Sequence, residues 1–440
     1  MNSVLKKLQG KADQAEVYHL HSRSVPVTFR SGKLESIKVQ ESEGLALRVI
    51  KSGRLGFGSS TDVQDPSALI DAALAAAAYG DQAGFSFPSV APTPRSSTSD
   101  PTVVAMRDEE LIAIGEAAIR RLGKADPGAS VNVILARSVD AVSVSNTSGL
   151  SLEEERTSVG VSVEIEKASA DDIFLLGDAT QARYLKDLRT DEIVDRLIEQ
   201  LHLGQTIVPV RSGNLPLVFT PNGAFALLLP LFSGFSGRSV YMGTSPLKGR
   251  VGERVFDSRV SIADDGTLAR AVGTAAFDDE GMPTERTALT TNGVVKGFLY
   301  DLRTAALAGA RSTGNGRKAS PFGDGSFRMP PGVGMTNFVV SPGKTPHHEL
   351  IASIDEGIMV EAVLGLGQGN VQAGDFSNNV AVGFKIEKGN LVGRVKNTMI
   401  SGNVYSLLKD HLIGLGDRAS WAFGFINTPS VAVSDVAVVA

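Results

Sequence analysis

Two short segments of the sequence bring together side chains that could do chemistry, and the first is acidic. Asp278-Asp279-Glu280 places three carboxylates in one turn, where they could hold a hard cation or act as an acid–base pair. The neighbouring Gly281 and Pro283 favour a third interpretation, because both residue types are typical of surface turns. We therefore expect a turn with solvated charges, and the two functional alternatives stay open.

The second segment is the loop Ser312–Arg317, in which two glycines allow another backbone to approach closely. Thr313, Asn315, Arg317 and Lys318 offer hydrogen-bond donors beside those glycines. A peptide lying against this loop would find partners for its carbonyl groups or its C-terminal carboxylate. The alternative is a structural turn stabilised by Asn315. A phosphate-binding loop is disfavoured, because neither a P-loop nor a dinucleotide fingerprint is present.

Metal and nucleophilic chemistry find little support in the sequence. The chain has 6 histidines and no cysteine, which excludes disulfides and thiolate metal sites. His347-His348-Glu349 does not have the spacing of a helical zinc pair, because Ile351 and Ala352 occupy the positions where a second ligand would stand. No Gly-x-Ser-x-Gly elbow with a credible triad is present. We expect no metal, no other cofactor and no catalytic residue.

Composition narrows the class of protein. The chain has 440 residues, 42% of them hydrophobic, and a net charge of -5, as is ordinary for a soluble globular protein. The negative charge argues against a nucleic-acid partner, since phosphate binding needs a clustered positive surface. Residues 1–14 carry lysines but no apolar signal-peptide region, and no run reaches the length of a membrane span. We expect a cytoplasmic protein with no nucleic-acid or membrane partner.

Hydrophobic periodicity predicts an α+β fold in four parts. Residues 1–80 form an N-terminal α+β module, and residues 81–107 form a linker or surface loop rich in proline and serine. Residues 108–212 form a middle α+β module. Residues 213–440 form a mostly β C-terminal domain that contains a buried helix.

Local signals give a finer pattern. Four turn signals between apolar runs predict hairpins, at Ser31-Gly32, Ser52-Gly53, Asn292-Gly293 and Lys388-Gly389. Amphipathic spacing predicts helices over residues 108–122, ended by Gly123, and over residues 191–203. Two alternating runs, at residues 131–136 and 139–145, predict separate strands.

The buried helix of the C-terminal domain is expected over residues 222–234, directly after an apolar strand at residues 215–219. It is apolar on every face, and a helix with no polar stripe must be buried against other elements. It is too short to cross a bilayer, which takes roughly 20 apolar residues. We therefore expect it to lie in the core of its domain.

The stretch from Leu215 to Val255 resembles the start of the C-terminal domain in the TldD/PmbA family, also known as the modulator of DNA gyrase or TldD–TldE metallopeptidase family. Four later segments match motifs of that family in the same order: Phe277–Pro283, Ser312–Arg317, Gly374–Ser377 and Val395–Asn403. The resemblance covers nearly the whole chain.

In the metal-binding branch of that family, the buried helix carries His-Glu-x-x-x-His, and a cysteine follows near the C-terminus. The corresponding positions here are Leu228, Leu229 and Ser233, and the chain has no cysteine. These side chains cannot hold zinc, so the chain resembles the metal-free branch, called PmbA or TldE. The resemblance implies a peptide-binding subunit, inactive alone, that pairs with a TldD-like zinc-bearing homologue. The alternative is an independent peptide-binding or scaffold homodimer without a hydrolytic role.

Candidate residues for both roles follow from these segments. The peptide-binding candidates come from the glycine-containing loop and from the Gly374–Ser377 motif: Thr313, Asn315, Arg317 and Asp375. The candidate contacts between chains are three aromatic residues in a late stretch that matches no family pattern: Trp421, Phe423 and Phe425. Their alternation predicts one strand face, which is either core or interface.

Overall fold

The computed structural model describes residues 1–91, 97–169, 172–318 and 326–440, and two large β-sheets organise it. The first is a 7-stranded antiparallel sheet of order β4-β3-β1-β5-β6-β7, with β2 paired to β1. Its strands are β1 (Gln14–Arg30), β2 (Lys33–Ile37), β3 (Gln40–Lys51), β4 (Arg54–Ser60), β5 (Ser130–Asn146), β6 (Ser151–Ser169) and β7 (Asp172–Ala182).

The second sheet has 11 strands, and its longest path runs β11-β10-β9-β14-β20-β18-β16-β15-β8. Its strands are β8 (Gly213–Phe219), β9 (Ile262–Asp265), β10 (Arg286–Thr291), β11 (Val294–Val295), β14 (Phe338–Val340), β15 (Glu356–Leu364), β16 (Asp375–Glu387), β17 (Asn390–Arg394), β18 (Met399–Asn403), β19 (Leu412–Ala422) and β20 (Ile426–Val439). A small separate pair joins β12 (Gly316–Arg317) to β13 (Gly332–Val333).

Short and medium helices complete the fold. The α-helices are α1 (Asn2–Lys7), α2 (Ser67–Ala77), α3 (Pro101–Ala105), α4 (Asp108–Ala125), α5 (Thr190–Leu203), α6 (Phe225–Gly234), α7 (Gly237–Met242), α8 (Leu302–Ala308), α9 (His347–Ala352) and α10 (Val404–Asp410). None of the helices in the described part of the chain is long and apolar enough to cross a membrane. Helices and extensive sheets together confirm the α+β prediction.

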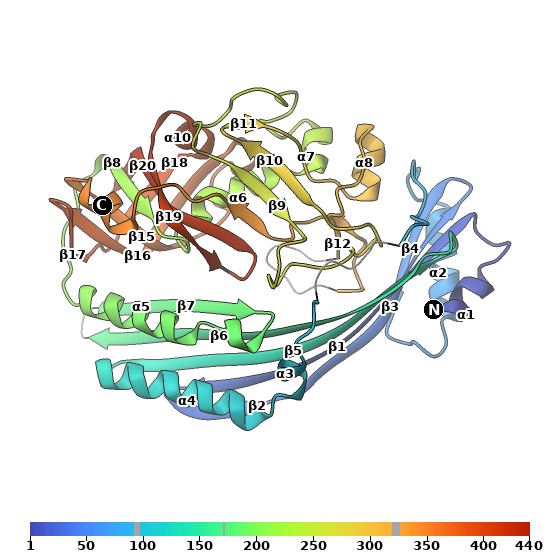
Figure 1. Cartoon of the computed structure of the whole chain (residues 1–440), viewed down its shortest axis with the longest axis horizontal. Coiled ribbons are helices and arrows are strands. Elements are labelled where there is room, and N and C mark those ends of the chain that lie inside the picture. Colours follow the sequence, from blue (N-terminus) through green and yellow to red (C-terminus); the bar gives the residue numbers. More distant parts are fainter. Residues whose placement is uncertain (92–96, 170–171, 319–325) are drawn as a thin grey trace.

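The first sheet spans the two modules expected at residues 1–80 and 108–212, because β1 pairs with β5 along 14 consecutive positions. In Figure 1 this sheet is a long curved layer beneath the second sheet, with α4 and α5 at one end and α1 and α2 at the other. One face carries the helices: Val27 and Phe29 of β1 share a core with Leu111 of α4 and Leu197 of α5.

The opposite face of the first sheet meets the C-terminal domain. Tyr18 of β1 and Val142 and Val144 of β5 share a core with Phe277 and Phe327, which lie far along the chain. Because side chains alternate across a strand, these positions and those under α4 lie on opposite faces. The sheet is therefore buried on both faces where the domains join.

All four predicted hairpins are confirmed. The turn residues have the positive φ values of a type I′ turn: Ser31 48° and Gly32 76°, Ser52 50° and Gly53 73°, Asn292 48° and Gly293 77°, and Lys388 49° and Gly389 75°. Each turn joins two paired strands, for example Arg30 to Lys33 between β1 and β2. Turn chemistry alone therefore located these connections.

Two local predictions are wrong. Helix α4 runs past Gly123 to Ala125, and a methyl group at Gly123 would meet nothing within 4 Å, so that glycine does not act as a stop. The runs 131–136 and 139–145 form one strand, β5, because its pairing with β6 continues without a break from Ser130 to Ser145. Partners on both sides, β1 and β6, keep β5 continuous where the local pattern suggested an interruption.

Candidate functional site

Helix α6 carries Leu228, Leu229 and Ser233, the positions that the family resemblance compares with zinc ligands. Leu228 is 2% exposed and shares that core with Phe219 of β8, which confirms the predicted burial of the helix. Leu229 is half-buried against the same core. Ser233 contributes one hydroxyl, whose Oγ lies 3.4 Å from Ser239 Oγ. Since zinc takes three or four good ligands, these side chains do not fit a zinc ion.

Phenylalanine rings pack around α6 where a metal centre would need polar atoms. The ring centroid of Phe225 lies 4.7 Å from that of Phe423 and 6.5 Å from that of Phe425. The centroid of Phe232 lies 4.9 Å from that of Phe338 and 6.0 Å from that of Phe425. These spacings are those of favourable aromatic pairs. The surroundings of the helix are therefore apolar.

The prediction that Trp421, Phe423 and Phe425 share one strand face is wrong. Strand β19 ends at Ala422, and the next three residues form the turn into β20. Phe423 has a φ of 53° and is 51% exposed, whereas Trp421 and Phe425 are half-buried. A turn residue with positive φ does not follow strand alternation. Phe423 and Phe425 pack against Phe225 of α6, whereas Trp421 lies within β19 and faces α5 and α9.

The acidic turn is buried, so the prediction of solvated charges is also wrong. Asp278 and Glu280 have 0% exposure, and Asp279 has 5%. The turn packs tightly against β6 and its neighbourhood: Gly281 has a φ of 77°, and a methyl group added there would lie 2.6 Å from Leu150 Cδ2. Gly281 and Pro283 correctly predicted a turn, but these residue types do not indicate whether the turn is exposed or buried by another part of the chain.

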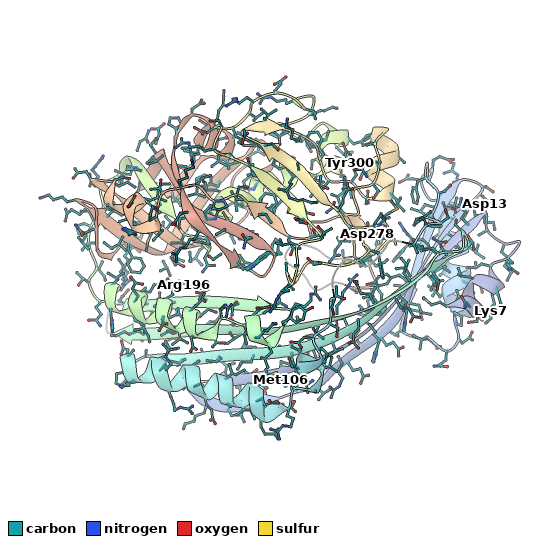
Figure 2. The ribbon with its side chains drawn as sticks, viewed as in Figure 1. Lys7, Asp13, Met106, Arg196, Asp278 and Tyr300 are labelled. Carbon is teal, nitrogen blue, oxygen red and sulfur yellow. The ribbon has the colours of Figure 1, made fainter. Side chains whose placement is uncertain are left out.

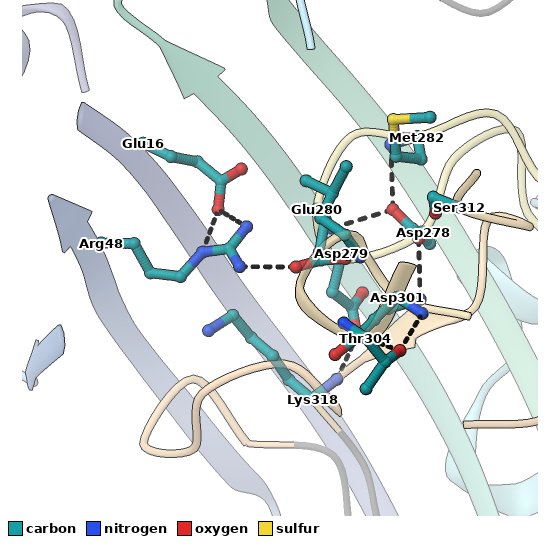
Figure 3. Close-up of polar contacts among 12 residues, drawn as sticks. Glu16, Arg48, Asp278, Asp279, Glu280, Met282, Asp301, Thr304, Ser312 and Lys318 are labelled. Atoms are coloured by element: carbon teal, nitrogen blue, oxygen red, sulfur yellow. Dashed lines mark hydrogen bonds and ion pairs between the residues drawn. The ribbon is translucent and has the colours of Figure 1, made fainter. Parts of the chain in front are cut away.

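Glu280 joins an ion network that links the first sheet to the loop between β9 and β10, as Figure 3 shows. Arg48 Nη1 donates to Glu280 Oε1 at 2.5 Å, and Arg48 Nε and Nη2 donate to Glu16 Oε1 at 2.9 and 2.8 Å. Glu16 and Arg48 are register partners on β1 and β3, so their side chains share one face. Burial raises the pKa of Glu16 and, opposed by the charge of Arg48, raises that of Glu280 to about 7.

Asp278 holds the acidic turn together through backbone donors. Its Oδ1 accepts the N–H groups of Glu280 at 3.0 Å and Met282 at 2.9 Å, and its Oδ2 accepts that of Gly316 at 2.8 Å. Burial, and then the charge of Glu280, raises the pKa of Asp278. The oxygens that a cation would need are already engaged. Within the described ranges, no group of three or more His, Cys, Asp or Glu is arranged to hold a metal.

The loop Ser312–Arg317 uses most of its donors internally. Thr313 Oγ1 donates to Asn315 Oδ1 at 2.7 Å, and Asn315 Nδ2 donates to Asp264 Oδ2 at 2.7 Å. Burial nevertheless raises the pKa of Asp264 to about 6. Arg317 differs, because its Nη1 is buried and has no hydrogen-bond partner among the described residues. For Thr313 and Asn315 this geometry favours the structural turn, and their contact with peptide stays a prediction.

Two further residues singled out in the sequence are Lys318, which directly follows this loop, and Asp375 on β16. Lys318 is 2% exposed, and its Nζ donates to Met329 O at 2.9 Å above the rings of Tyr18 and Phe57. Burial, and then the charge of Arg48, lowers the pKa of Lys318 to about 8. Asp375 begins β16 and accepts from Asn403 Nδ2 at 2.8 Å. No described hydrogen bond or ion pair joins Asp375 to the loop.

Sequence reasoning missed Glu16 and Arg48, although a signal was present. Each is a single charged residue inside an apolar strand run, Ala15-Glu16-Val17 and Leu47-Arg48-Val49. A charge at a position that strand alternation places against a buried layer needs a partner. Pairing β1 with β3 in register would have brought these two opposite charges together.

Comparison with known proteins agrees with this architecture. Residues 212–440 match the PmbA/TldA metallopeptidase C-terminal domain, and residues 15–78 match PmbA/TldA metallopeptidase domain 1. A metalloprotease of Methanothermobacter thermautotrophicus is 29% identical over 99% of this chain and 95% of its own length. A metalloprotease TldD homologue of Buchnera aphidicola is 28% identical over 62% of this chain and 58% of its own. The crystal structure of TldE from Thermococcus kodakarensis has the same fold, with a TM-score of 0.87, 24% identity and full coverage of both chains.

Proposed function

The chain belongs to the PmbA/TldD metallopeptidase family, and from this membership we propose that it is a non-catalytic, peptide-binding subunit of a zinc-dependent proteolytic complex. Its partner in that complex is a TldD-like homologue that carries the zinc. Both chains would work in the cytoplasm on peptide substrates. In this proposal the chain contributes binding surface and leaves bond cleavage to its partner.

The observation that carries the proposal is the composition of α6. Leu228, Leu229 and Ser233 stand where metal-binding relatives have their ligands, and phenylalanine rings fill the adjoining space. A zinc-activated water needs an open coordination position on a metal held by three protein ligands. The described chain supplies no such set. Hydrolysis within the complex therefore falls to the other subunit.

Peptide binding is proposed at the Arg317 end of the glycine-containing loop. Arg317 has a buried guanidinium nitrogen, Nη1, with no partner among the residues that the structure describes. A buried donor without an acceptor costs free energy, and a peptide carbonyl or C-terminal carboxylate would remove that cost. Asp375, half-buried at the start of β16, is the acidic candidate for a peptide amino group or N–H.

Pairing is proposed through the end of the β19–β20 hairpin, with Phe423 and Phe425 in its turn and Trp421 on the other face of its first strand. Phe423 leaves half of its surface exposed, and an exposed aromatic residue beside half-buried aromatic residues is typical of interface cores. A stable interface would bury upwards of ~1,200 Å² in total. The same surface would serve a homodimer in the absence of the zinc-bearing chain.

Light scattering tests the pairing. The chain alone, of 46.1 kDa, is expected to have the mass of a homodimer at micromolar concentration, and addition of the zinc-bearing homologue from the same organism should give a mixed pair. Phe423→Asp should shift both assemblies toward single chains, because it buries a charge in the interface. Tyr79→Asp is the matched control, since Tyr79 follows α2 and is 92% exposed.

Two results would contradict the pairing proposal. A monomer mass for the wild-type chain, with no change when the homologue is added, would remove both the homodimer and the mixed pair. A homodimer that never exchanges with the homologue would instead establish the independent scaffold.

A further inference from the structure

A cavity of about 350 Å³ lies between α5, α9, the second sheet and the turn Thr220–Asn222 that precedes α6. Its walls include Arg196 and Glu199 of α5, His347 of α9, Glu361 of β15 and Trp421 of β19. Figure 2 shows Arg196 at the boundary between α5 and the second sheet. Ligand pockets for small molecules begin at about 300 Å³, so this cavity has room for a small organic group.

The cavity and α6 lie on opposite faces of the second sheet. Met359 of β15 belongs to the core shared with α5, whereas its neighbours Ile358 and Val360 belong to the core around α6. Side chains alternate across a strand, so a group in the cavity has no access to α6 through the sheet. The cavity is therefore separate from the degenerate zinc position.

Glu361 is aimed into the cavity by an irregularity of its strand. The pairing of β15 with β16 skips this residue, since Val360 pairs with Gly383 and Ala362 pairs with Val382. An unpaired extra residue of this kind is a β-bulge, and bulges commonly redirect a side chain beside a functional site. Glu361 is 6% exposed, so the bulge places its carboxyl group in a buried position.

Arg196, whose charge acts on Glu361, is already engaged by another carboxylate. Arg196 donates to Asp178 Oδ2 from both Nε at 2.8 Å and Nη2 at 2.6 Å. Asn222 Nδ2 then bridges the two acids, 3.1 Å from Asp178 Oδ1 and 3.3 Å from Glu361 Oε1. Across the described residues, no arginine, lysine or histidine forms an ion pair with Glu361. Glu361 thus has two neutral donors, the Asn222 amide and the Thr220 hydroxyl, and feels the charge of Arg196 without pairing with it. Since a carboxylate has about four acceptor sites, its oxygens retain acceptor capacity toward the cavity.

We propose that this cavity binds an organic ammonium ion, with Glu361 as its counter-ion and Trp421 as an aromatic wall. A buried carboxylate needs a positive partner, and an aromatic face attracts the same kind of ion. Of the other ionisable groups around the cavity, Asp178 and Arg196 pair with one another, Glu199 is acidic, and His347 and His348 are the two imidazoles. The amino terminus of a peptide and the side chain of a lysine are two sources of this one chemistry. The proposal does not depend on the zinc-bearing partner.

The titration of Glu361 gives the binding a characteristic pH dependence. Burial, and then the charge of Asp178, raises its pKa to about 7. Burial lowers the pKa of His347, the other titratable group in the wall with a shifted pKa, so this imidazole is mainly neutral near pH 7 and does not compete for the carboxylate. An ammonium ion binds the ionised carboxylate, so binding should release protons near neutral pH.

Isothermal titration calorimetry on the full chain tests the proposal with three probes. N-acetyl-lysine amide carries only a side-chain ammonium, alanyl-alanine amide carries only an α-ammonium, and N-acetyl-(Nε-acetyl)lysine amide carries neither. At least one ammonium probe should bind about tenfold or more tightly than the neutral probe. Comparison of the two ammonium probes identifies the source. Binding of the lysine probe should tighten about tenfold between about pH 6 and about pH 8, as Glu361 ionises.

Variants separate this proposal from a general surface effect. Glu361→Gln should weaken binding of the ammonium probe and flatten the pH dependence of that binding. Glu109→Gln, a change in the exposed first turn of α4, should alter neither the affinity nor its pH dependence. Binding of the ammonium probe to the wild-type chain should release protons. Calorimetry in two buffers of different ionisation heat measures this release without any variant. Equal affinity for the neutral probe, binding without proton release, or an unchanged Glu361→Gln profile would each overturn the proposal.

Discussion

Replacing Arg48 with alanine should lower the free energy of unfolding by about 3–5 kcal/mol, the largest effect expected from one substitution in this chain. Arg48 neutralises Glu16 and Glu280, and all three side chains are at least nine-tenths buried. Its removal leaves two buried carboxylates without a cation, each of which must then bind a proton or stay charged at high cost. Chemical denaturation of both proteins at neutral pH measures the loss.

The loss from Arg48→Ala should also depend on pH, with a definite sign. Without Arg48 the pKa values of Glu16 and Glu280 rise further above those of an unfolded chain, so the folded variant binds more protons than its unfolded form. Its stability should therefore rise as pH falls from about 8 toward about 5, and the deficit relative to the wild type should shrink. A deficit that grows on acidification would contradict the assigned network.

An exposed ion pair provides the matched control for Arg48. Arg30 Nε donates to Glu35 Oε1 at 2.9 Å, but the Arg30 side chain is 69% exposed. Solvent screens that attraction, so Arg30→Ala should cost less than about 1 kcal/mol. Similar costs for the two substitutions would show that burial of the Arg48 network contributes little to its energy.

Replacing Leu228 with alanine should cost about 2–5 kcal/mol, because the change removes buried methyl groups and leaves a cavity. Leu228 is 2% exposed in the core that α6 shares with the second sheet. Leu229 on the same helix is half-buried, so Leu229→Ala should cost clearly less, which makes the neighbouring position the control. The comparison again uses chemical denaturation. Equal small costs, below about 0.5 kcal/mol at both positions, would mean that α6 is not a core helix.

Replacing Leu228 with histidine tests whether α6 could hold a metal ion. Leu228→His introduces a polar ring into the core that also contains Phe225 and Phe232, and among the described residues no group of three or more His, Cys, Asp or Glu is arranged to hold a metal. The physical cost of burying that ring exceeds what a single zinc bond returns, so the variant should lose stability without acquiring zinc. Lower stability without bound zinc, measured by chemical denaturation and elemental analysis, would show that the apolar surroundings of α6 also exclude a metal.

Local sequence patterns predicted the individual helices, strands and turns of this fold better than they predicted which of these elements pack together. The hairpin at Asn292-Gly293 needs only two residues that accept positive φ, and an apolar helix such as α6 must be buried whatever covers it. The pairing of β1 with β5 joins residues more than a hundred positions apart, and no periodicity within either strand identifies its partner. The single sheet that spans both N-terminal modules could not be derived locally.

The same limit explains the errors at the candidate site. The turn that contains Asp278 and Glu280 has the composition of a surface turn. Arg48, which lies 232 positions earlier in the chain, nevertheless donates a hydrogen bond to the buried Glu280. Trp421 and Phe425 alternate as strand residues do, but Phe423 between them adopts positive φ and reverses the chain. Glu361 gave no signal at all, because a β-bulge becomes visible only in the pairing of two strands.

Peptide hydrolysis by the purified chain, alone and mixed with its zinc-bearing homologue, tests the central claim most directly. An untagged preparation with added zinc should leave an unfolded peptide substrate intact, because Leu228, Leu229 and Ser233 cannot hold the metal. The mixture should cleave it, and a chelator should stop that cleavage. Hydrolysis by the isolated chain, insensitive to the chelator and following its elution profile, would contradict the account.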